Sequence, residues 1–378
     1  MPDSIAIISL SQYCAVFIVS IYFAKIYENS VHAGSRSNIE HILSFVLVVA
    51  PVSLMFGLRS YDVGYDTVEH YWSYFQYYKY ASFSDLLQMG REPLYALLTY
   101  ACYNIFHNYT VNLLVISFLT NGIFFYAVTR FRQRISIPLA WFVYLFYFAL
   151  LTEDQSRNML GISIVMVSLQ YVVHKRPVAF VITVAIATLV HFSMACGVLL
   201  YLANLESKHG SRSHVSITVP LMIMILACVF IQLIYNLLGS VVTSFDSKYS
   251  RYFGEYATLE TTSNTGLGFL LVMIPNLFPV LIFRKQLSSN MDRLFLFAAL
   301  LSCPLRMLGY ESLFLSRLSY LPSAVMVLTY GSMYTRCLNS KHRSVFLYAT
   351  VVLFVFCYIY MYTNTHGVVP YEIIFAED

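Results

Sequence analysis

The sequence has few charged residues. Only 11% of its 378 residues are Asp, Glu, Lys or Arg, while 58% are hydrophobic. A soluble domain has about 25% charged residues, so a surface that faces water on all sides is excluded. The composition indicates an integral membrane protein. No Pro- or Ser-rich linker divides the chain, and we therefore expect one transmembrane domain that covers residues 1–378.

Several functional motifs are also absent. There is no basic stripe with interleaved aromatic residues and no zinc-ligand spacing, so nucleic acid is not an expected partner. There is no nucleotide-binding loop, no Ser-His-Asp order, no haem motif and no metal triad. The seven cysteines are scattered, mostly in apolar runs, which indicates core residues and not a disulfide framework. We expect no metal and no cofactor.

Long apolar runs, in contrast, are abundant. About 20 apolar residues cross the hydrocarbon core as a helix. The first run has no preceding Lys or Arg and no small-residue cleavage site, so it is expected to be a retained span and not a signal peptide. The clear candidate spans are residues 4–27, 39–58, 110–129, 137–151, 159–173, 216–238, 266–283, 294–310, 318–334 and 344–362.

Lys and Arg in short loops predict the orientation, because such loops stay in the cytoplasm. The basic loops are residues 130–134, 174–176, 208–212, 284–285 and 336–343, whereas the acidic, aromatic segment 60–91 is expected outside. Because the basic loops before and after residues 178–205 are both assigned to the cytoplasm, this segment must cross outward and return. We expect a hairpin of two short helices that turns near His191. Residues 92–106 form a re-entrant or interfacial helix. The predicted fold is all-α, with about 12 transmembrane helices and both termini outside.

Four polar clusters fall on the predicted outer side. Charges at the ends of spans are costly and usually mark a pathway or a site. We therefore expect one cavity that opens to the outside. The clusters are residues 57–67, residues 153–158, His191, and Tyr310-Glu311 with Arg317.

The first cluster offers an anion site with candidate bases. Arg59 ends a span, and its guanidinium matches the geometry of a phosphate. Alternatively, this side chain reaches to the membrane interface. Gly64 permits a tight turn between Asp62 and Asp66. Either carboxylate pairs with Arg59 or serves as a general base.

The other clusters add further candidates. Arg157 follows Gln155 at the start of a predicted helix, where free N–H groups attract anions; the alternative is an ordinary solvated loop. His191 is either a satisfied core residue or a group that protonates or hydrogen-bonds a diphosphate. Arg317 holds a phosphate or pairs with Glu311. Together these groups suit a lipid-linked diphosphate delivered in the membrane, with no nucleotide or metal required.

Four segments of the sequence also form an ordered series of motifs. They are Gly57-Leu58-Arg59 with Val63-Gly64-Tyr65-Asp66-Thr67, Tyr71 and Phe75; Arg91-Glu92-Pro93-Leu94-Tyr95; Gln155-Ser156-Arg157-Asn158-Met159; and Ala187-Thr188-Leu189-Val190-His191-Phe192-Ser193. In this order they resemble the motifs of the EpsG-like, Wzy-type polysaccharide polymerases, over about the first half of the chain. Two positions depart from that pattern. Tyr65 stands where a small residue or Thr is usual, and Asn158 stands where Gln is usual.

The resemblance implies a glycosyltransferase in the bacterial inner membrane. Such enzymes join repeat units carried on undecaprenyl diphosphate, at the outer face, into O-antigen, capsule or exopolysaccharide. The implied partners are this lipid-linked oligosaccharide, membrane lipid, a chain-length regulator and a flippase. A glycan ligase and a flippase or transporter are the alternatives. The implied catalytic residues are Asp66, Asp62, His191 and Glu92, and the implied diphosphate- and sugar-binding residues are Arg59, Arg157, Arg317, Gln155 and Tyr71.

Overall fold

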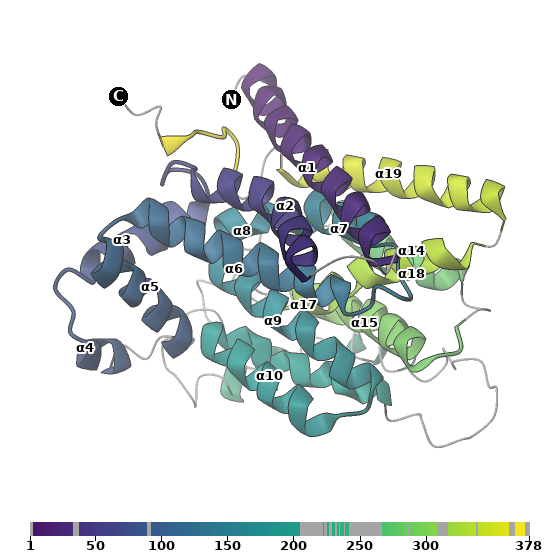
Figure 1. Cartoon of the computed structure of the whole chain (residues 1–378). Helices are drawn as coiled ribbons and strands as arrows, with labels where there is room; N and C mark the ends of the chain where they lie inside the picture. The colour runs from purple at the N-terminus through teal and green to yellow at the C-terminus, as the bar shows by residue number, and fades with distance from the viewer. Residues whose placement is uncertain are drawn as a thin grey trace. The chain divides into compact units, whose positions relative to one another are not determined.

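The fold is all-α within the part of the chain that the computed structural model describes (Figure 1). Described are residues 3–32, 38–88, 92–204, 267–283, 285, 287–307, 317–337, 339–362 and 367–374, with scattered positions between 222 and 241. The basic loop 208–212 and residues Tyr310 and Glu311 therefore lie outside the described residues, as does most of the predicted span 216–238.

Five of the described helices are long and apolar enough to cross a membrane. Shorter apolar helices accompany them, among them α7 (Ile137–Tyr144), which continues as a π-helix through Ala149. The predicted all-α polytopic membrane fold is confirmed, while the number of spans stays a prediction. The five long helices are α1 (Asp3–His32), α2 (Asn38–Gly57), α6 (Tyr109–Thr129), α9 (Ser156–Val173) and α19 (Ser340–Tyr362).

The chain divides into two compact units. The first comprises Met1–Gln170, Val181–Ala195 and Tyr330–Asp378. In it α1 packs against α2 and α7, and α2 packs against α6. The side chain of Trp141 is fully buried, and its Nε1 donates a hydrogen bond of 2.7 Å to Ser20 Oγ. This bond satisfies the one polar atom of the indole, as burial in an apolar bundle requires.

The second unit comprises Tyr171–Phe180 and Cys196–Thr329. In it α14 (Leu267–Ile282) packs against α15 (Asn290–Met307), which packs against α17 (Tyr320–Ala324). The carboxylate of Asp292, in the first turn of α15, accepts hydrogen bonds from the N–H groups of Ser288 and Ser289, which directly precede this helix, as in a capping box. The prediction of a single domain is not tested by this division and stays a prediction.

Two short helices occupy the region predicted as a hairpin. They are α10 (Pro177–Val190) and a 3-10 helix, η3 (Phe192–Asn204), and His191 is the residue between them. Asn204 Nδ2 donates a hydrogen bond of 2.9 Å to the carbonyl of Val172, and the rings of Phe180 and Tyr201 lie 5.2 Å apart. The end of η3 therefore lies beside the end of α9, close to where the segment begins, and the two short helices meet at His191.

The segment predicted as an outer loop is largely helical. It contains a π-helix, η1 (Thr67–Tyr71), followed by α3 (Trp72–Tyr77) and α4 (Phe83–Gln88), both of which contact α5 (Pro93–Phe106) (Figure 1). α5 has 14 residues and is therefore about 21 Å long. This is too short for a core of about 30 Å. Its expected re-entrant or interfacial position stays a prediction.

The first unit has two chemically different ends. At one end, the segment 367–374 pairs with the turn after α2, since Ser60 N donates to Glu372 O (2.8 Å) and Ile374 N to Leu58 O (3.0 Å). At the other end, Glu28 near the end of α1 accepts a hydrogen bond from the N–H of Ile137, which follows the basic loop 130–134. The turn that carries Asp62 and Asp66, which we call the acidic turn, and this basic loop thus lie at opposite ends of the unit, while the orientation in the membrane stays a prediction.

Gly64 provides a test of this packing. Its φ is +95°, and a Cβ at this position would overlap the carbonyl oxygen of Glu153. We expect Gly64→Ala to lower the free energy of unfolding by about 1–3 kcal/mol or more, because both the backbone conformation and the contact become unfavourable. Thermal unfolding of the purified protein in detergent measures this change.

The matched control is Gly122→Ala, within α6. The nearest atom to a Cβ there lies 4.0 Å away, so the substitution should leave stability unchanged or raise it by up to about 1 kcal/mol. Equal melting temperatures for both variants would contradict the proposed packing of the turn against Glu153.

Candidate functional site

Three side chains from distant parts of the sequence meet in the first unit. Arg157 Nη1 lies 2.9 Å from Glu92 Oε2, and His191 Nδ1 lies 2.9 Å from Glu92 Oε1. Glu92 directly precedes α5, Arg157 lies in the first turn of α9, and His191 separates α10 from η3. One carboxylate therefore holds a guanidinium and an imidazole together. We call these three residues the charged triad.

A glycine makes this meeting sterically feasible. Gly161 lies one turn after Arg157 on α9, and a Cβ there would lie 3.5 Å from the Cβ of His191 and 2.6 Å from Cγ of Met194. A larger residue would require the side chain of Met194 to move, while the Cβ of His191 lies at an ordinary contact distance. The absence of a side chain thus lets His191 approach the same turn of α9 that carries Arg157.

The electrostatics of the triad fix the charge of Glu92. Its side chain is only 10% exposed. Burial by itself raises the pKa of Glu92, but the hydrogen bond with His191 and the charge of Arg157 lower it to about 2. The carboxylate is therefore ionised at neutral pH. Because so weak a base accepts protons poorly near pH 7, the geometry favours Glu92 as the group that orients Arg157 and His191.

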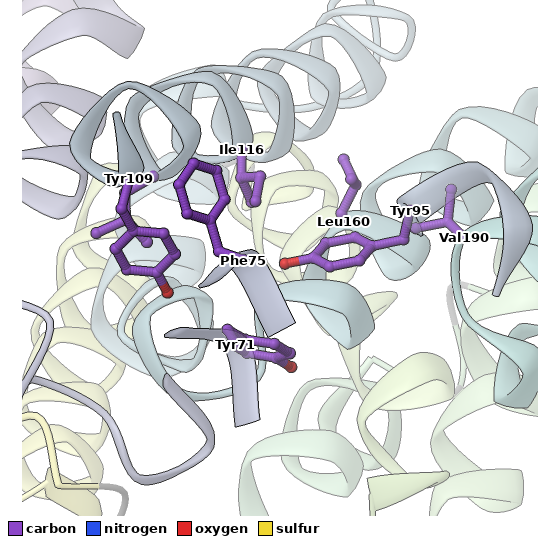
Figure 2. Packing of buried hydrophobic residues seen from close by; sticks show 8 residues of the cluster. Tyr71, Phe75, Tyr95, Tyr109, Ile116, Leu160 and Val190 are labelled. Atoms are coloured by element: carbon purple, nitrogen blue, oxygen red, sulfur yellow. The ribbon is translucent and has the colours of Figure 1, made fainter. Parts of the chain in front are cut away.

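Aromatic side chains surround the triad. The guanidinium carbon of Arg157 lies 5.2 Å from the centre of the Tyr71 ring, a cation–π distance. Tyr71, Phe75 and Tyr95 belong to a buried cluster that is completed by residues of α6, α9 and α10 (Figure 2). This cluster fixes the walls of the site.

A narrow cavity lies between these walls. Its lining includes the charged groups of Glu92 and Arg157 and the aromatic rings of Tyr71, Tyr74 and Tyr95. Its volume is about 20 Å³, which is room for one water-sized group. The cavity can accept a single hydroxyl or phosphate oxygen, whereas a sugar ring requires the walls to move.

Arg59 lies elsewhere in the same unit and is almost completely buried, with 1% exposure. Its guanidinium donates hydrogen bonds to the carbonyl oxygens of Phe56, Val63 and Glu153, the last at 3.0 Å, and to Thr67 Oγ1 at 3.3 Å. These acceptors join the end of α2 to the following turn and to α8 (Leu151–Asp154). The burial favours a structural role for Arg59 over the predicted phosphate-binding one.

The remaining predicted residues occupy different environments. Asp62 is exposed, and the N–H of Asp66 donates a hydrogen bond of 3.1 Å to the Asp154 carboxylate. Gln155 is buried and accepts a hydrogen bond of 3.0 Å from Asn158 Nδ2. Arg317 is half-buried and belongs to the second unit, so it is described separately from the triad. The catalytic and binding roles expected for these four residues stay predictions.

Glu153 is a buried acid that the sequence analysis did not single out. Tyr13 donates a hydrogen bond of 2.6 Å to its Oε2, and its backbone carbonyl accepts from Thr67 Oγ1 at 2.7 Å. Burial raises the pKa of Glu153 to about 8, although the charge of Arg59 and the hydrogen bond from Tyr13 act in the opposite direction. Glu153 lay within a recognised polar cluster, but no sequence pattern links it to Tyr13.

Comparison with known proteins decides the family. The family model described as EpsG matches residues 42–373, nearly the whole chain. The chain belongs to the EpsG family. This is a Wzy-like polysaccharide polymerase family, so the resemblance found in the first half of the sequence is confirmed. No curated protein and no solved structure matches the chain.

The family assignment identifies a polysaccharide polymerase-like, multi-pass membrane protein. All three residues of the charged triad lie within the range that matches the EpsG family.

Arg59 and Arg157 should respond differently to the same substitution. Arg59→Lys leaves several buried acceptors without donors, and we expect a loss of about 1–3 kcal/mol in the free energy of unfolding. Arg157→Lys keeps its charge beside Glu92, at a side chain that is 23% exposed, and should change stability far less. Melting temperatures of both variants in detergent test this. A smaller loss for Arg59→Lys than for Arg157→Lys would refute the structural role of Arg59.

The raised pKa of Glu153 predicts a pH-dependent stability. The ordinary pKa of a glutamate is about 4.3, so between this value and about 8 the folded state binds the additional proton. The stabilisation is complete below the ordinary pKa and is lost as the pH rises to 8. Glu153→Gln should remove this decline in melting temperature, whereas Asp62→Asn, at an exposed acid, should retain it. A wild-type melting temperature that is constant from pH 5 to pH 8 would exclude the buried proton.

Proposed function

We propose that this protein polymerises oligosaccharide repeat units carried on undecaprenyl diphosphate. The observation that carries the proposal is the charged triad, in which Glu92 and Arg157 line an aromatic cavity and Glu92 also binds His191, in a chain of a polysaccharide polymerase family. We place the reaction on the extracytoplasmic face of the bacterial inner membrane. The position of the basic loop 130–134 at the opposite end of the first unit from the acidic turn supports this orientation.

Arg157 is the proposed ligand of the diphosphate. Glu92 engages its Nη1, while Nε is buried and has no hydrogen-bond partner among the residues that the structure describes. A buried donor without an acceptor is costly, and a phosphate oxygen would satisfy it. The N-terminus of α9 adds a partial positive charge at the same place. Guanidinium and helix end together suit an anion with several oxygens.

The proposed reaction transfers the growing chain to a hydroxyl of the incoming unit. The acceptor oxygen forms a bond to the anomeric carbon while the bond from that carbon to the diphosphate oxygen breaks. The leaving diphosphate keeps the electron pair and is stabilised by Arg157. The proton of the acceptor hydroxyl passes to a base, and atoms and charge balance without a metal or a nucleotide.

His191 is the proposed base. The carboxylate of Glu92 accepts from Nδ1, which orients the ring and directs Nε2 to exchange the proton, as an adjacent acid does for histidine in hydrolases. The acidic residues Asp62 and Asp66 are the alternative bases. The small cavity beside Glu92 is suited to hold the acceptor hydroxyl, and Tyr71 and Tyr74 supply aromatic surface for the sugar.

Substitutions in the triad test this function. Arg157→Ala should stop chain lengthening, so that cells carry single repeat units, and Arg157→Lys should restore it only in part because it lacks the planar fork. His191→Ala should lower the rate by about 10²–10⁴-fold. The measurements are glycan ladders on gels, normalised to protein abundance, and polymerisation of purified lipid-linked units without metal or nucleotide.

Lys341→Ala, at an exposed residue preceding the apolar part of α19, is the control and should give normal ladders. Long ladders from Arg157→Ala would contradict the role of this residue. Transport as the true function is distinguished by the purified reaction, since a flippase would leave the repeat units unjoined. A ligase would transfer them only to a different acceptor.

A further inference from the structure

A second cavity lies at the end of the first unit that carries the basic loop 130–134. Its volume is about 560 Å³, within the range of roughly 300–1,000 Å³ that is usual for ligand pockets. Residues of α1, α7, α18 (Met326–Arg336) and α19 line it. None of the charged triad contributes to its walls. The cavity is therefore separate from the charged triad.

Its lining is divided into an apolar and a cationic part. Ile21, Leu139, Phe142 and Leu347 provide hydrocarbon surface from three helices. Lys25, His32 and Arg132 line the same cavity. An occupant should therefore combine a hydrocarbon part with a negatively charged head.

The carboxylate of Glu28 does not cancel this positive charge. Its Oε1 accepts a hydrogen bond of 2.8 Å from the N–H of Ile137, at the start of α7, and its Oε2 lies 2.8 Å from Lys25 Nζ. Lys25 nevertheless remains 57% exposed, and Arg132 adds a second cation. Arg343 lies over the ring of Tyr334, another lining residue, at 5.5 Å. The net charge around the cavity is positive.

The outer faces of the same helices indicate where the occupant comes from. Beside the lining residues, α1 exposes Ile18 and Tyr22, and α19 exposes Val345 and Val352. Exposed apolar side chains on membrane helices face lipid. The apolar part of the cavity thus belongs to helices with apolar outer faces, and its cations lie near the end of α1 and in the loop before α7, where basic side chains of membrane helices reach headgroups.

We propose that this cavity binds an anionic phospholipid. Its phosphate lies at Lys25 and Arg132, and an acyl chain lies between Phe142 and Leu347. Basic pockets between membrane helices select anionic headgroups in this way. Bound lipid joins α1 to α7 and α19, so it stabilises the folded state by mass action. This site is independent of the proposed polymerase function.

The test uses the purified full-length protein in nonionic detergent. Phosphatidylglycerol or phosphatidylcholine is titrated in, and binding is followed by the rise in melting temperature and by native mass spectrometry. The wild type should prefer phosphatidylglycerol. Each removed cation, in Lys25→Gln and Arg132→Gln, should weaken this binding about fivefold. Leu347→Trp, which fills the apolar part, should abolish the preference, while Lys25→Arg should keep it.

Two further measurements make the outcome decisive. Lys79→Gln removes an exposed cation in the turn between α3 and α4 and should bind phosphatidylglycerol like the wild type. Inorganic phosphate alone should not raise the melting temperature. Equal binding of both lipids by the wild type, an unchanged preference in Leu347→Trp, or a full effect of free phosphate would overturn the proposal.

Discussion

The buried guanidinium of Arg59 is the interaction on which the rest of the site depends. In a membrane protein, the unpaired backbone carbonyls at the end of a helix need hydrogen-bond donors from the protein itself. Arg59 supplies them to the end of α2, to the turn that follows and to α8. Through α8 it fixes the start of α9, which carries Arg157, and through Thr67 it fixes η1, which carries Tyr71. One side chain thus places both partners of the cation–π contact.

The charged triad adds a second constraint, which acts between helices. Arg157 lies 65 residues after Glu92 in the sequence, and His191 lies 99 residues after it. Truncating Arg157 or Glu92 leaves a largely buried charge without its ion-pair partner, which is costly in an apolar surrounding. The aromatic cluster below the triad limits their movement. The result is a preorganised site, and preorganisation is the property from which electrostatic catalysis gains most.

Much of this arrangement was predictable from the sequence, for physical reasons. Low charge and long apolar runs predict membrane helices directly, and the excess length of residues 178–205 predicts a break near His191. The role of Arg59 was not predictable, because a phosphate ligand and a buried bridge have the same local sequence. Its acceptors include the carbonyl of Glu153, 94 residues away. The contact of Glu153 with Tyr13 and the assignment of Glu92 as an orienting group likewise depend on tertiary packing.

In the proposed reaction, the ion pair between Arg157 and Glu92 has one role before the substrate binds and another afterwards. Without substrate, Glu92 neutralises a cation that would otherwise be poorly solvated. With a diphosphate present, the guanidinium can serve both anions, because its fork presents donors in two directions. In the protein without substrate the carboxylate has a pKa of about 2, so it is ionised near neutral pH and holds His191. Binding of the leaving group and orientation of the base are therefore coupled through a single carboxylate. In the proposed reaction, this coupling gives a carboxylate that is a weak base its place at the centre of the site.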